Sequence, residues 1–180
     1  MSFKIPANIT VPFGIDLPIQ ALQTDLSNKL SWLSHSFGRA FKNEDKDGQF
    51  VPECYVGGDE YQELLPDDSV DAMCFFDVDD SVSFENRQSK TNVRIIFFIN
   101  LEKCFPTLSH RADENAIVDI YDILKSYAHG WELTDVKKIA KNIFAEYNYT
   151  QSWLDDMQPY FVCSFECELT YNYLKSECYT

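Results

Sequence analysis

The clearest pattern along the chain is a period-two alternation of apolar and polar residues between Phe161 and Tyr173, with Val162 as the one apolar residue of the polar set. Successive side chains of a β-strand point to opposite faces, so an alternation of this length predicts a long strand near the C-terminus. We expect one face to pack against helices and the other to meet water or a neighbouring subunit. The inward set is Phe161, Cys163, Phe165, Cys167, Leu169, Tyr171 and Tyr173, and the outward set includes Glu166, Glu168 and Thr170.

Two strongly apolar runs in the middle of the chain, 70–78 and 93–101, predict two further strands. The stretch between them, 79–92, is polar and has no helical period. Parallel neighbours need a long crossover, usually a helix, and none is indicated here. The two runs are therefore predicted to form an antiparallel hairpin with a long tip.

Three segments place apolar residues at the three- and four-residue spacing of amphipathic helices. The first covers 19–42 and follows Pro18, which a first helical turn tolerates. The other two, 113–127 and 134–147, form a pair separated by Gly130, with Thr134 as an N-cap. The inward positions are Leu22, Leu26, Leu30, Leu33, Phe37 and Phe41, then Ile117, Ile120, Tyr121 and Leu124, then Val136, Ile139, Ala140, Ile143 and Phe144.

The remaining segments are an N-terminal arm and an acidic loop. Prolines interrupt residues 1–17, which we expect to be an extended arm packed along a neighbour or the domain's own edge, with Phe3, Ile5 and Phe13 as its contact residues. Residues 43–69 are turn-rich and predict a long loop with at most a short strand at 54–56.

Together these elements predict an α+β fold. A mainly antiparallel sheet would carry a long N-terminal helix and a helix pair, and would close with the long C-terminal strand. A chain of 180 residues is large enough for one hydrophobic core without disulfides or metals. We therefore expect the arm, 1–17, followed by a single domain, 18–180.

Charge is distributed unevenly along the chain. The net charge is −14, and the segment from Asp47 to Glu85 holds twelve acidic residues and no basic one. Gripping a nucleic-acid backbone takes an excess of lysine and arginine, so direct nucleic-acid binding is not expected. The segment is either a solvated face or a surface that repels phosphate or meets a basic partner. The candidate contact residues are Asp67, Asp68, Asp79 and Asp80.

The cysteines and prolines point to a reducing compartment. Pro6, Pro12 and Pro18 interrupt every apolar stretch that would form a signal peptide or membrane span, so the protein is expected to stay inside the cell. Its six cysteines include no C-x-x-C pair and are predicted to be free thiols. Cys163 and Cys167 lie four residues apart on a predicted strand, about 13 Å, too far to share one zinc ion.

No metal or cofactor site is predicted. Asn43, Asp45, Asp47 and Gly48 match the first half of a calcium loop, but Cys54 stands where a bidentate glutamate is needed, so an acidic turn is the preferred interpretation. The three histidines, at 35, 110 and 129, have no metal-ligand spacing.

One short stretch resembles a catalytic motif. Residues 74–82, an apolar strand followed by Asp77, Asp79 and Ser81, resemble the first motif of haloacid-dehalogenase-like phosphatases. The resemblance implies a nucleophile at Asp77 and a general acid at Asp79, with Lys137 or Lys138 as phosphate clamp and Asp155 and Asp156 as magnesium ligands. The next strand has no intervening helix and ends at Asn100, where that family has serine or threonine. We therefore expect structural or electrostatic roles for Asp77 and Asp79.

The order of the elements over about 19–175 resembles the tail terminator and head–tail connector proteins of tailed bacteriophages. The resemblance implies a non-enzymatic structural protein of the virion neck or tail, assembled in the host cytoplasm. Its partners would be its own copies in a ring and the adjacent rings, with neither membrane nor sequence-specific nucleic-acid binding. An acidic loop suits a channel that passes DNA, because like charges repel. The alternatives are the phosphatase and an intracellular protein-binding module.

Overall fold

A computed structural model describes residues 8–44, 46, 50–64, 70–85, 88–108, 110–127, 129–147 and 159–172, and the backbone of Ile5 and Pro6. Within these residues seven strands form one sheet in the order β1-β2-β6-β8-β10-β9, with β7 paired to β8. The strands are β1 (Ile5–Pro6), β2 (His35–Arg39), β6 (Ala72–Val78), β7 (Ser83–Glu85), β8 (Gln88–Asn100), β9 (Trp131–Lys137) and β10 (Tyr160–Asn172).

The sheet is mixed but mainly antiparallel. Only β1 and β6 run parallel to their neighbour β2. The predicted hairpin is confirmed, since β6 and β8 pair antiparallel with Phe75 opposite Ile96. The predicted terminal strand is also confirmed, because β10 pairs with β8 along its whole length, from Tyr160 opposite Asn100 to Asn172 opposite Gln88. The α+β class follows directly from the alternation in the sequence.

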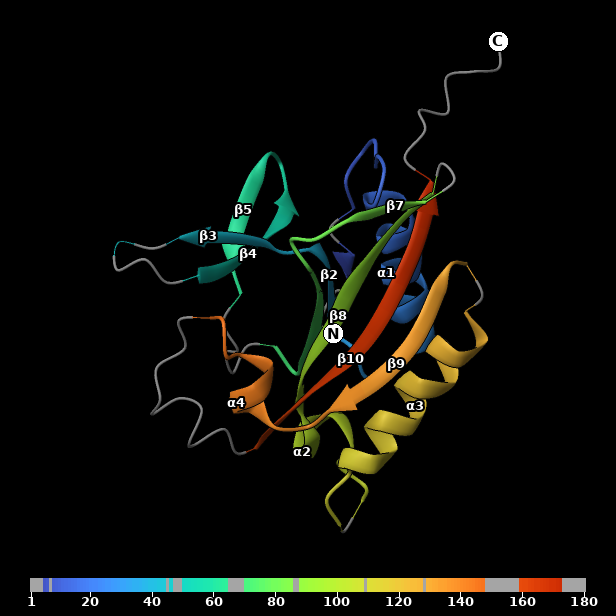
Figure 1. The fold of residues 1–180 in the computed structure, drawn as a ribbon. Helices are drawn as coiled ribbons and strands as arrows, with labels where there is room; N and C mark the ends of the chain where they lie inside the picture. The colour runs from blue at the N-terminus through green and yellow to red at the C-terminus, as the bar shows by residue number, and fades with distance from the viewer. Residues whose placement is uncertain are drawn as a thin grey trace.

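The first face of the sheet packs against α1 (Asp16–Lys29) and α3 (Asp113–Ser126) (Figure 1). The inward positions of β10 belong to this core, where the rings of Phe165 and Phe97 meet edge to face at 5.9 Å. The face predicted for Phe165, Cys167 and Leu169 is therefore confirmed.

The second face carries a smaller core. A three-stranded sheet of β3 (Phe41–Glu44), β4 (Phe50–Gly57) and β5 (Glu60–Glu63) and the short helix α4 (Ala140–Ile143) lie on this side. Phe98 stacks on Phe144 at 5.2 Å between ring centroids. The short helix α2 (Leu101–Cys104) follows β8 directly. This second layer explains why Val162 and Ser164, on the outward face of β10, are buried.

The N-terminal helix is shorter than predicted. It ends at Lys29, and the chain continues as β2 and β3. Residues 33–41 also alternate, with small residues at every second position. The segment has few of the β-branched residues that favour strands, but pairing with the neighbouring strand β6 stabilises it as β2. Gln23 of α1 fastens this strand, because its amide donates to the carbonyl oxygen of Ser36 at 2.7 Å.

The segment 43–69 is not a plain loop. Within its described residues, β4 and β5 pair antiparallel and form a hairpin through Gly57 and Gly58, both at positive φ. Glycine adopts this left-handed conformation without steric cost, so the two residues make the tight turn possible. Of the four residues that match a calcium loop, only Asn43 is described, on β3. Asp45, Asp47 and Gly48 lie outside the described residues.

The prediction of a second helix over 134–147 is also wrong. Residues 131–137 form β9, an outer strand paired with β10, and only 140–143 are helical. The helical spacing of Val136, Ile139 and Ile143 follows a short alternation at Trp131 and Leu133, which an irregularity at Thr134 interrupts. The exposed edge of β10 favours the strand. Thr134 is not an N-cap, since its hydroxyl donates to the carbonyl oxygen of Glu166 at 2.9 Å.

The N-terminal arm lies on the domain's own edge where it is described. Ile5 and Pro6 pair with β2, and Gln20 of α1 exchanges hydrogen bonds of 2.8 and 3.2 Å with the backbone of Ile9. No helix in the described part of the chain has the length and apolar character to cross a membrane.

We expect the thiols to be unreactive in the folded protein. The five described cysteines are free, and burial raises the pKa of Cys74, Cys104 and Cys167 to about 12. Because thiolate is the reacting form, a Cys178→Ser variant should take up iodoacetamide very slowly at pH 8 and take up five equivalents in denaturant. Rapid labelling of one thiol in the native protein would contradict the burial of the cysteines.

Candidate functional site

The predicted contact residues fall in different places. Asp79 and Asp80 follow β6 and are exposed, and Phe13 is exposed just before α1. All three line one hollow of about 460 Å³. Asp67, Asp68 and Phe3 lie outside the described residues, and only the backbone of Ile5 is described.

The acidic segment of the sequence is not one surface. Asp71 pairs with Lys103 at 3.4 Å beside α2, while Asp77 points to the second face of the sheet. Five residues of β6, 72–76, separate these two aspartates in sequence, so they lie toward opposite ends of that strand. Of the acidic residues between 47 and 85 that the structure describes, only Asp79 and Asp80 line the hollow of Phe13.

A cluster of charged residues closes the second face of the sheet beyond its aromatic core. Asp77, Arg94 and Glu166 stand opposite one another on three adjacent strands, β6, β8 and β10. Side chains two residues apart on a strand share a face, so this charged row continues the row of Phe75 and Ile96. With their neighbours these residues line a hollow of about 280 Å³.

Asp77 is the centre of the charged cluster. It is 1% exposed, bonds to the guanidinium of Arg94 and lies 3.4 Å from the amine of Lys42. Glu146 closes the cluster from the outside, 3.1 Å from Lys42 and 3.3 Å from Arg94. Arg94 also donates to the carbonyl oxygen of Ile143 at 3.2 Å and so holds α4 to the sheet.

The electrostatics of the cluster favour its charged forms. Burial lowers the pKa of the Lys42 amine, but the charges of Asp77 and Glu146 outweigh burial and raise that pKa above its ordinary value. The hydrogen bond from Lys42 lowers the pKa of Glu146. Each ion therefore stabilises its neighbours, and the cluster contributes to the fold at neutral pH.

This geometry gives no support to the phosphatase alternative. Both carboxylate oxygens of Asp77 face cations. Its strand, β6, pairs antiparallel with β8, whereas the phosphatase motif lies in a parallel sheet. Hydrogen bonds from Ser81 and Asn92 outweigh burial and lower the pKa of Asp79, which disfavours the protonated form that a general acid needs. The proposed clamp residues pair elsewhere, Lys137 with Glu166 and Lys138 with Glu114, and Asp155 and Asp156 lie outside the described residues.

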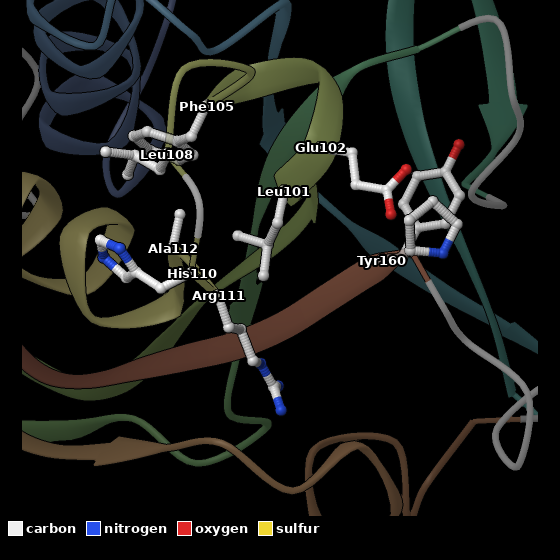
Figure 2. Close-up of a pocket in the computed structure, with 9 residues that line it drawn as sticks. Leu101, Glu102, Phe105, Leu108, His110, Arg111, Ala112 and Tyr160 are labelled. Atoms are coloured by element: carbon white, nitrogen blue, oxygen red, sulfur yellow. The ribbon is translucent and has the colours of Figure 1, made fainter.

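A third hollow, of about 390 Å³, lies between α2, the segment before α3 and the start of β10. Figure 2 shows that its two charged side chains, Glu102 and Arg111, point in different directions. Arg111 is engaged with Asp113 at 3.3 Å and lies 5.7 Å above the ring of Phe161. The polar groups do not converge on a common point, which a specific ligand site requires.

The hollow lined by Phe13 has a different character, because large apolar side chains surround it. Phe41 from β3, Val82 before β7 and Phe84 within β7 join Phe13 there, and all four are exposed. Phe84 is the most exposed of them, at 71%. We call the surface formed by Phe13, Phe41, Val82 and Phe84 the apolar groove.

The charges of the apolar groove are unbalanced. Arg39 pairs with Asp16 at 2.9 Å and covers the ring of Phe41 at 4.9 Å. Lys42, which also lines the groove, pairs with Asp77 and Glu146 in the charged cluster. Asp79 and Asp80 form no ion pair with any described residue, so the groove presents an apolar surface with a negative rim.

Of the four groove residues, the sequence pattern predicted only Phe13 as a contact residue. Phe41 looked like an inward position of the first helix, and Val82 and Phe84 lie in a polar stretch without a period. The only signal for the last two is a pair of apolar residues in a polar hairpin tip, which is too common to indicate an interface.

In the described residues no group of three histidine, cysteine or acidic side chains has the arrangement of a metal site. Comparison of the chain with protein-family models, with curated proteins and with solved structures gave no match.

Proposed function

We propose that the protein is a structural subunit that assembles with its own copies into a ring, of the tail-terminator or head–tail connector kind, in the neck or tail of a bacteriophage virion. The observation that carries the proposal is the apolar groove. Single exposed apolar residues are ordinary on monomers, whereas several gathered at one place mark an interaction surface. Here three separated segments, around Phe13, Phe41 and Phe84, supply them.

Two further observations support a structural role. The charged cluster is internally neutralised by Arg94 and Lys42, and the hollow of Figure 2 has no converging polar groups. The bacteriophage resemblance rests on the predicted order of elements, of which the first helix, the hairpin, one long helix and the closing strand are present, with β9 in place of the second long helix. Adjacent rings would be the second class of partner.

We expect the purified protein to associate into particles larger than a dimer, because ring subunits present two different surfaces to their neighbours. Light scattering and sedimentation velocity over a range of protein concentrations measure the size, and electron microscopy shows whether the particles are closed. A protein that stays monomeric both alone and when mixed with the other neck or tail proteins would contradict the proposal and favour a monomeric binding module.

A further inference from the structure

One short segment has a charge opposite to that of the chain as a whole. Residues 136–145 contain Lys137, Lys138 and Lys141 and no acidic residue, although the net charge of the chain is −14. Ile139 stands among these lysines and is 61% exposed. One exposed apolar side chain is ordinary by itself, but with three lysines around it Ile139 matches a partner surface that is apolar with a negative rim. We call residues 137–141 the lysine segment.

The lysines of this segment are available to a partner. Lys141 is exposed and forms no ion pair with any described residue, and the amines of Lys137 and Lys138 lie 3.4 and 2.5 Å from Glu166 and Glu114. The side chains of Lys137 and Lys138 are 40% and 44% exposed, and of their partners Glu114 is exposed and Glu166 half-buried. Exposed ion pairs contribute about 1 kcal/mol or less, so exchanging them for pairs across an interface costs little.

The apolar groove and the lysine segment are complementary in both respects. The groove offers apolar walls and a rim of Asp79 and Asp80, and the segment offers one large apolar side chain and three positive charges. Opposite charges at matching positions steer two surfaces together and penalise wrong partners. The other ten-residue stretch with three bases and no acid, 86–95, has Arg94 in the charged cluster and Lys90 paired with Glu168.

The two surfaces lie at opposite ends of the central sheet. The lysine segment begins at Lys137, which stands beside Ser164 and, through it, Ile96 of β8, whereas Phe84 stands beside Ser89 of β8. The seven residues from Ser89 to Ile96 span about 23 Å of strand. Figure 1 shows the same separation, with β7 at one end of the sheet and the turn from β9 to α4 at the other. Ile139 therefore does not reach Phe84 of its own chain, although Lys137 and Asp79 line one hollow in the charged cluster.

We propose that the lysine segment of one copy inserts Ile139 into the apolar groove of the next copy, with its lysines facing Asp79 and Asp80. This inference rests on the proposed self-assembly and names the surfaces that carry it. Because the two surfaces differ and lie at opposite ends, the contact is head to tail, and its repetition gives a closed ring or an open filament.

The decisive experiment uses two variants that each destroy one surface, Phe84→Asp and Ile139→Asp. Both side chains are exposed, so circular dichroism should show an unchanged fold. Each variant alone should lower the association constant at least about tenfold, because it places a charge at the centre of the contact. An equimolar mixture should recover a two-chain complex but no larger particle, since one intact groove meets one intact lysine segment.

One control variant and two tests of the charges complete the experiment. Val118→Asp on α3 is matched in exposure, at 53%, and should assemble like the parent protein. Asp80→Lys and Lys141→Glu should each weaken association, and the double variant should recover part of it. Association of the parent should weaken as salt rises, because screening removes attraction between opposite charges.

The possible outcomes separate the inference from the proposed function. If the parent assembles and Ile139→Asp assembles equally well, the head-to-tail contact is overturned while self-assembly stands. If Phe84→Asp alone weakens assembly, the groove holds another segment and the inference also fails. Association that strengthens with salt overturns it as well and favours the acidic residues as a repelling channel lining. A monomeric parent overturns the proposed function itself.

Discussion

Replacing Arg94 with leucine is expected to destabilise the fold by about 3–5 kcal/mol, because it leaves the carboxylate of Asp77 buried without its main partner. Lys42 remains 3.4 Å from Asp77 and offsets part of the loss. The variant also loses the hydrogen bond to the carbonyl oxygen of Ile143, which holds α4. Denaturant melts followed by circular dichroism measure the change in the free energy of unfolding.

The control is a double variant, Asp77→Leu with Arg94→Leu. Removing both ions of a buried pair is often nearly neutral, so this variant should be clearly more stable than Arg94→Leu alone. Lys29→Ala, which removes an exposed pair with Asp25, should cost less than about 1 kcal/mol. A double variant less stable than the single one would contradict a cluster in which charge neutralisation is the main contribution.

The same cluster predicts how stability depends on pH. The pKa of Glu146 is lowered in the fold, so its contribution is present above the ordinary glutamate pKa of about 4.3 and is lost as the pH falls through the lowered value. The pKa of Lys42 is raised, so its contribution is present below about pH 10.4 and is lost as the pH rises through the raised value. Glu146→Gln should therefore flatten the acidic limb of the stability profile.

Replacing Phe165 with alanine is expected to cost about 3–5 kcal/mol, since the side chain is fully buried between the sheet and the helices. The loss includes its edge-to-face contact with Phe97. Glu168, three residues along the same strand and on the other face, is half-buried and pairs with exposed Lys90. We expect Glu168→Ala to have a several-fold smaller effect in the same denaturant melts. Equal effects of the two substitutions would mean that the strand faces are assigned the wrong way round.

Long periodic segments could be predicted from the sequence because their patterns fit only one structure. The alternation over 161–173 coincides with all of β10 but its first residue, and Ile117, Ile120 and Leu124 repeat along α3, which begins at the predicted residue. In such segments each residue's local preference and its burial point to the same element.

Shorter segments could not be predicted because two periods coincide in them. Leu33, Phe37 and Phe41 fit a helix, yet the same stretch alternates and became β2 and β3 beside β6. Val136 and Ile139 fit a helix as well, yet β10 had an open edge for β9. In both cases the choice was made by a neighbouring strand whose unpaired backbone groups needed partners, which no local pattern records.

The sequence by itself determined the class of fold, the hairpin of β6 and β8, the long strand β10 and the excess of negative charge over 47–85. Each of these is a local property, either a period or a sum of charges. The tertiary structure alone decided that Asp77 is neutralised by Arg94 and Lys42, and that Asp79 and Asp80 lie beside the apolar groove. It also placed Phe84 of that groove and Lys137 of the lysine segment about 23 Å apart along β8. These relations join residues far apart along the chain, so they exist only once strand order and register are set.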